Sequence, residues 1–136
     1  MPALDFAFLA DAAEAEPNRK FYVLGGGIDV IAGQVAPLVH AHMALVMRFE
    51  VHPSELGRQH RLEVRMIDAD GGQLAKIEGV LETAGDSPLG RPVFINMVIN
   101  MANTQFAKSG DYAVEIVMND QHQKSLPLRV QIATDN

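Results

Sequence analysis

Apolar and polar residues alternate along much of the chain, and this alternation is typical of a β-strand with one buried face and one wet face. The clearest case is the segment 93–102. A helix would also place Asn96, Asn100 and Asn103 on one face, but Asn and Ile are mediocre helix formers. The unbroken alternation therefore predicts a strand whose buried face carries Val93, Ile95, Met97, Ile99 and Met101.

The same period recurs in segments 40–51, 61–66, 111–118 and 126–132. The alanine-rich start has no well-separated apolar face, and we predict a strand there as well, over about residues 4–14. Strands with one wet face are the mark of antiparallel sheets.

Turn residues separate these segments. Asp70-Gly71-Gly72 predicts a tight hairpin, because glycine tolerates a positive φ. Residues 119–124 predict a longer hairpin connection. Pro127 has no N–H to donate, so it predicts an edge position or the start of a strand.

Three consecutive glycines interrupt the strand-like stretch "FYVLGGGIDVIAG". A dinucleotide fingerprint would need a third spaced glycine, where this chain has Val30, and a helix after the loop. The residues that follow are β-branched instead. We therefore interpret the glycines as a bulge or bend through which the chain leaves one sheet and enters the other.

Seven to eight short strands joined by turns predict an all-β fold. We expect one domain over residues 1–136, folded as a two-layer antiparallel β-sandwich of the immunoglobulin-like or C2-like kind. The stretch "KSGDYAVEIVMND" supports this, because a tyrosine opening a late strand can pack at a sheet corner with its hydroxyl group bonded to backbone.

The stretches "KFYVLGGGIDVI", "HRLEVRMIDADGG" and "SGDYAVEIVMNDQHQKSLPLRV" together resemble a family of uncharacterised bacterial proteins. The resemblance covers about residues 4–130 and rests on framework elements: glycine bends, a hairpin and a tyrosine strand. It implies a small single-domain β-sandwich. It implies no activity and no catalytic residue.

Composition narrows the function classes further. The chain has no cysteine, so disulfides, thiolate nucleophiles and Cys-ligated zinc are excluded. The formal net charge is −6 and the basic residues are scattered, so we expect no nucleic-acid partner. No apolar run approaches the length of a membrane helix, and the acidic start does not have the character of a secretory signal. We expect a cytoplasmic protein that does not bind membranes.

His40 and His42 form the sharpest local candidate for chemistry. Residues two apart on a strand project from the same face, so the two imidazoles could hold one metal ion. Glu50 or His60 is a candidate third ligand. Two solvent-facing histidines are the alternative, and we weight that alternative more heavily.

Other chemistries have less support. Asp68-Ala69-Asp70-Gly71 hints at a calcium loop, but the twelfth position is Gly79 instead of an acid, so we interpret it as a hairpin turn. A hydrolase would need a Ser-His-Asp group assembled in space. Its possible nucleophiles lie in or beside predicted turns: Ser54, Ser87, Ser109 and Ser125.

The outward face of the strand 93–102 is the leading candidate surface. It combines apolar and amide side chains, namely Phe94, Asn96, Val98 and Asn100. An exposed apolar patch commonly marks an interface. We therefore expect a non-enzymatic interaction or assembly module without a cofactor, which binds a protein partner or forms a homodimer through this face or through an unpaired sheet edge. The alternatives are a small-molecule or metal site at His40 and His42, or a hydrolase.

Overall fold

The computed structural model describes residues 1–16, 20–83 and 87–133. Within them the chain forms nine strands and two short 3₁₀ turns, η1 (Pro53–Glu55) and η2 (Pro88–Gly90). The strands are β1 (Ala3–Ala15), β2 (Phe21–Gly26), β3 (Val30–Gly33), β4 (Leu38–Val51), β5 (Gln59–Ile67), β6 (Gln73–Glu82), β7 (Val93–Phe106), β8 (Gly110–Met118) and β9 (Gln121–Ile132). None of these described segments is a helix long and apolar enough to cross a bilayer.

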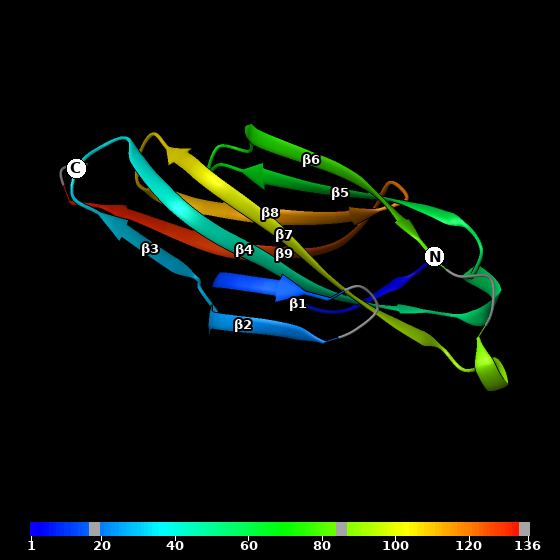
Figure 1. Cartoon of the computed structure of the whole chain (residues 1–136). Coiled ribbons are helices and arrows are strands. Elements are labelled where there is room, and N and C mark those ends of the chain that lie inside the picture. The colour runs from blue at the N-terminus through cyan, green and yellow to red at the C-terminus, as the bar shows by residue number, and fades with distance from the viewer. Residues whose placement is uncertain (17–19, 84–86, 134–136) are drawn as a thin grey trace.

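The strands form two layers (Figure 1). A four-stranded sheet has the order β2-β1-β4-β7, and a five-stranded sheet has the order β3-β9-β8-β5-β6. The all-β sandwich is thus confirmed, with two differences from expectation. Nine strands replace the seven to eight expected, and the β3–β9 pair is parallel while the other pairs are antiparallel.

Both differences come from the glycine segment. β2 ends at Gly26 in the four-stranded sheet, and β3 begins four residues later in the five-stranded sheet. Gly25 and Gly27 have φ values of 62° and 92°, which L side chains rarely adopt. The backbone of Gly27 also donates to the carbonyl oxygen of Leu9 at 2.7 Å. The predicted bend between sheets is therefore confirmed, and it makes two strands from one stretch.

The core lies between the layers. β4 supplies Met43, Leu45, Met47 and Phe49, all fully buried, and the facing sheet supplies residues such as Val114 and Leu128. The predicted strand at 93–102 is confirmed: the Met97 position pairs with Met47, and its apolar row points into the core. This row is only half-buried, because β7 is the last strand of its sheet.

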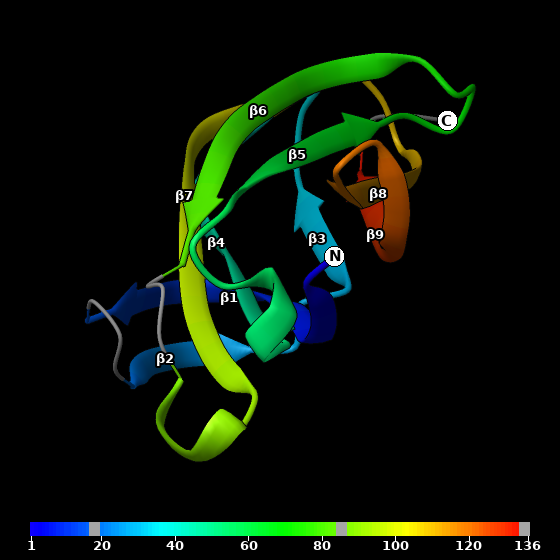
Figure 2. The ribbon, with the colours of Figure 1, turned by 90° about the vertical axis from the view of Figure 1, so that its right-hand side faces the viewer.

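A second apolar layer covers the outer face of the four-stranded sheet. The first half of β1 pairs with β4, while the second half pairs with β2. Figure 2 shows this β1–β2 hairpin running across β7 and projecting beyond it. The ring of Phe21 on β2 consequently lies 5.9 Å from that of Phe6, although strand pairing places Phe21 at the other end of β1. Because the sheet curls in this way, Ala44 and Val46 are fully buried although they face outward.

The predictions for the tyrosine corner and for the hairpin turns are confirmed with one exception. The hydroxyl group of Tyr112 donates to the carbonyl oxygen of Lys108 at 2.7 Å, as expected for a tyrosine at a sheet corner. Asp68 accepts from the backbone of Gly72 at 2.7 Å and closes the predicted hairpin turn. The exception is the predicted long connection at 119–124. β8 and β9 are joined by Asn119 and Asp120 alone, both with positive φ, because this two-residue turn matches the twist of the strands.

Pro127 lies inside β9, where it pairs with Ala113 of β8. β3 contacts the opposite side of β9 only from Arg129 onward. The proline therefore occupies a local edge, as its missing N–H requires.

Candidate interaction edge

β7 is the most unusual strand of the molecule in its composition. It has 14 residues, VFINMVINMANTQF, and none is charged, glycine or proline. It is also the terminal strand of its sheet, and among the residues that the structure describes it pairs with β4 alone. Natural proteins usually blunt such an edge with charges, prolines, bulges or shortness. On β7 the only break is at Asn103, with φ 51°, near its C-terminal end, and the segment 93–102 is left without such a device.

β6 is the edge strand on the same side of the five-stranded sheet, and it is blunted. Its ten residues include Lys76, Glu78 and Glu82. Its pairing with β5 also shifts register between Met66 and Ile67. Residues 73–80 are exposed, so both faces of β6 meet water.

A small, mostly apolar groove of about 190 Å³ lies between these two edge strands. Its walls are Leu62, Ile77, Glu78, Gly79, Val80, Met97, Val98 and Ile99. Gly79 leaves open space where another residue would carry a Cβ. The core of the sandwich is therefore reachable from this side.

A second groove, of about 320 Å³, lies on the other side of β7. The overhanging hairpin contributes residues 13–16, and β7 contributes residues 96–98 and Asn100. Glu14 and Glu16 give it an acidic character. Neither carboxylate forms an ion pair in the part of the chain that the structure describes, and Glu16 only accepts a long hydrogen bond of 3.4 Å from the Tyr22 hydroxyl.

The four predicted interface residues lie on the outward face of β7 in unequal environments. Phe94 is 44% exposed, and its ring carries the Arg48 guanidinium 4.1 Å from the centroid. Asn100 is exposed, whereas Asn96 and Val98 are half-buried beside the hairpin. The outward patch is thus partly covered by the chain itself. Its role as an interface stays a prediction.

The predicted histidine pair does share one face of β4. His42 Nδ1 donates to the carbonyl oxygen of Asp11 at 2.8 Å, and Nε2 of His40 is buried without a hydrogen-bond partner among the described residues. His60 lies in the other sheet, and Glu50 is eight residues further along β4 than His42. In the described parts of the chain, no three His, Cys, Asp or Glu side chains are grouped for a metal.

Among the described residues, Ser, His and Glu side chains lie together in two groups, and neither group has the geometry of a hydrolase triad. Nε2 of His122 lies 2.5 Å from Glu115 and 3.3 Å from Ser125, so one ring nitrogen faces both partners. A triad needs the acid and the nucleophile on different nitrogens. The cross-strand register of Glu115 and Ser125 explains their contact. Burial raises the pKa of Glu115, but hydrogen bonds from Ser125 and His122 outweigh it and leave that pKa below its ordinary value.

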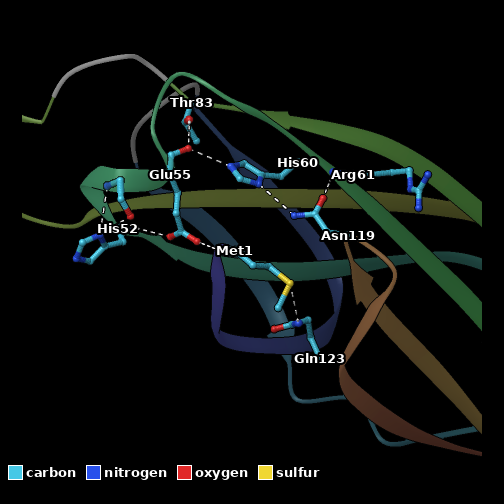
Figure 3. Close-up of polar contacts among 9 residues, drawn as sticks. Met1, His52, Glu55, His60, Arg61, Thr83, Asn119 and Gln123 are labelled. Atoms are coloured by element: carbon cyan, nitrogen blue, oxygen red, sulfur yellow. Dashed lines mark hydrogen bonds and ion pairs between the residues drawn. The ribbon is translucent and has the colours of Figure 1, made fainter.

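The second group belongs to a polar cluster around η1 (Figure 3). His52 caps the turn, with Nδ1 at 2.9 Å from the Ser54 hydroxyl, and Glu55 accepts from the backbone of His52 at 2.8 Å. The other oxygen of that carboxylate pairs with the ammonium group of Met1. These contacts hold a turn and a chain end in place.

His60 is the buried centre of this cluster (Figure 3). Its Nε2 donates to the carbonyl oxygen of Glu55 at 3.1 Å, and Nδ1 accepts from the Asn119 amide at 3.2 Å. Asn119 in turn accepts from the backbone of Arg61 at 2.8 Å. Burial, the nearby N-terminal charge and Arg58 lower the pKa of His60. The two hydrogen bonds of His60 thus link η1 to the β8–β9 turn.

Sequence reasoning missed both the overhanging hairpin and the grooves beside β7. One signal was present. In residues 3–15, apolar side chains occur in both alternating sets of positions. Ala44 and Val46 are likewise apolar in the set of β4 that faces outward. Such a pattern indicates strands that are covered on two faces.

Comparisons with solved structures give distant likenesses. An alkylpurine DNA glycosylase AlkC from Pseudomonas fluorescens, solved with DNA, aligns at TM-score 0.48 and 13% identity over 76% of this chain. A glycosyl hydrolase family 2 member from Bacteroides cellulosilyticus DSM 14838 aligns at 0.35 and 9% over 69%. A β-glucuronidase of glycoside hydrolase family 2 aligns at 0.35 and 16% over 72%. This chain spans 28%, 14% and 11% of those chains, respectively.

No curated protein matches the sequence. A family model described as a family of unknown function (DUF6941) does match, over residues 5–131. That range contains every strand from β2 to β8 and most of β1 and β9. The resemblance to an uncharacterised family is therefore confirmed, and the chain belongs to the family of unknown function DUF6941.

Proposed function

We propose that this protein is a non-enzymatic interaction and assembly module whose contact element is the free edge of β7. The observation that carries the proposal is the composition of that edge: 14 residues without a charge, at the end of a sheet. An uncharged strand with one unpaired edge offers a row of backbone N–H and C=O groups to another chain. Its partner would add a strand to the four-stranded sheet.

Burial of the inner row favours such an addition. Ile95, Met97, Ile99 and Met101 pack against the core but remain half-exposed. An added strand would remove more of this apolar surface from water, at about 25 cal/mol per Å². The added backbone hydrogen bonds would fix the partner's orientation. A homodimer is the simplest assembly to test first.

The proposal also includes two finer assignments. The corner formed by Tyr112, whose ring meets Phe106 edge-on at 5.0 Å, supports an immunoglobulin-like kind of sandwich. The absence of cysteine supports a cytoplasmic location.

The test is affinity capture from the native host with the wild-type protein and two lysine variants. Asn100→Lys adds a charge to the edge of β7, and Leu24→Lys is the matched control on β2, the opposite edge of the same sheet. We expect the partner to be retained by wild type and Leu24→Lys and lost by Asn100→Lys. Hydrogen exchange on the complex should then show new protection of amides in residues 93–102.

Retention of the partner by Asn100→Lys, with protection of amides elsewhere, would place the contact on another surface. Light scattering of the purified protein provides the second readout. A dimer that dissociates in Asn100→Lys but not in Leu24→Lys would identify a second copy as the partner.

A further inference from the structure

We infer that the edge of β7 receives a single extended segment of a partner protein, in which apolar residues alternate with basic residues. This inference rests on the proposed function and names the chemistry of its partner. It follows from the two grooves that flank β7, because an added strand would send alternate side chains into each of them.

The inner groove selects the apolar positions. Leu62, Ile77, Met97 and Ile99 line its 190 Å³, and the missing side chain at Gly79 leaves space for an incoming one. A polar side chain would lose its hydration against these apolar walls. The Glu78 carboxylate also lines this groove, but it is already paired with Lys76 at 2.8 Å.

The outer groove selects the basic positions. Its 320 Å³ are lined on the hairpin side by Glu14 and Glu16, separated by Ala15, and on the β7 side by Asn96 and Asn100. Both glutamates are exposed and lack an ion-pair partner within the described residues. A lysine or arginine on the added strand would supply the missing charge, while a glutamate there would be repelled.

The hairpin also favours a single strand over a second copy. It crosses the outer face beside residues 96–100 and projects beyond β7 (Figure 2). If two copies paired their β7 strands about a two-fold axis at this segment, both hairpins would occupy the same space beneath the paired strands. A single extended segment has no such hairpin of its own, so it can lie against the projecting β1–β2 hairpin without overlap.

The test uses two synthetic nine-residue peptides, one alternating valine with lysine and one alternating valine with glutamate, titrated against the full chain. We expect the lysine peptide to bind about tenfold more tightly, since two exposed charge pairs contribute about 1.4 kcal/mol together. Methylating alternate backbone nitrogens of the peptide should abolish binding. The double variant Glu14→Gln and Glu16→Gln should remove the tenfold preference, whereas Glu82→Gln with Asp120→Asn, an equal charge change at residues that line neither groove, should keep it.

The remaining outcomes separate this inference from the proposed function. Equal binding of both peptides, still blocked by backbone methylation, would overturn the basic preference and leave strand addition standing. Binding of neither peptide, together with a dimer that Asn100→Lys dissociates, would make a second copy the occupant and overturn the inference alone. Binding of neither peptide to a chain that remains monomeric would overturn both.

Discussion

On the outer face of the five-stranded sheet, Glu63 lies among three cations. Its carboxylate is 2.6 Å from Arg65, 3.8 Å from Arg61 and 3.9 Å from Lys76. The outer face of the four-stranded sheet carries phenylalanines and aliphatic residues, and there Val46 has no exposed surface. The outer faces of the two sheets therefore differ in chemistry, because one is charged and the other is largely apolar.

The difference lies in what completes each face. Charged side chains on the five-stranded sheet satisfy one another and the solvent, so that face needs no cover. The apolar face needs one, and the chain uses its own β1–β2 hairpin for most of it. The hairpin crosses β7 and covers part of its outer face, but the backbone edge of β7 remains unpaired and uncharged. The sheet that is partly covered by its own hairpin is therefore also the one whose free edge we propose as the contact element.

Valines on the two outer faces give the largest expected contrast. Val46→Ala on β4 should lower the free energy of unfolding by about 2 kcal/mol, because it removes buried methyl groups and leaves a cavity. Val80→Ala on β6, where the valine is 55% exposed, should change it by less than about 0.5 kcal/mol. Urea denaturation measures both. Equal losses would mean that the hairpin does not cover Val46 in solution.

Substitutions of acidic residues on the two faces should differ less in their effect on the free energy of unfolding. Glu63→Gln removes a nearly buried carboxylate shared by three cations, and we expect a loss of about 1 kcal/mol. Asp5→Asn is the control on the four-stranded sheet, because Asp5 lies 3.6 Å from Arg48 in an exposed pair. Such pairs contribute about 0–1 kcal/mol. A smaller loss for Glu63→Gln than for Asp5→Asn would contradict the comparison.

His60, beside the η1 turn between the two sheets, should make the free energy of unfolding depend on pH. The pKa of His60 is lowered from 6.5 in the folded protein, so the unfolded chain binds the proton more tightly. The free energy of unfolding should therefore be at its full value above about pH 6.5. It should decline as the pH falls from there toward the lowered pKa of the folded state, and level off below that pKa. Thermal unfolding between pH 5 and 8 measures this. His60→Gln keeps a neutral polar side chain and should flatten the profile; an unchanged slope would assign it to other groups.

Much of the fold could be predicted from local pattern. The alternation at 93–102 fixed both the strand and its buried row, and the glycines after Leu24 indicated the change of sheet. These signals are local because a strand's two faces differ in every second residue, and because positive φ favours glycine.

The candidate site could be predicted only in part. Phe94, Asn96, Val98 and Asn100 lie on the strand now proposed as the contact element, but which of them is exposed depends on the hairpin from the other end of the chain. The crossing of β1 over β7 is a non-local contact that no sequence period records. The short turn at Asn119 was missed for a related reason, since the strands on either side decide its length.

The smallest effect on stability, and the most direct test of the comparison between edges, comes from making β6 resemble β7. The double variant Lys76→Val and Glu78→Val removes two of the three charges of β6 and lengthens its uncharged stretch. Because both positions are exposed, stability should change by less than about 0.5 kcal/mol. An uncharged edge should nevertheless attract other edges. Light scattering should therefore show association that grows with concentration, and Lys76→Arg with Glu78→Asp, which keeps the charges, should show none. If the valine variant associates no more than wild type does, charge is not what blunts this edge, and the uncharged composition of β7 would lose its meaning as a sign of a partner.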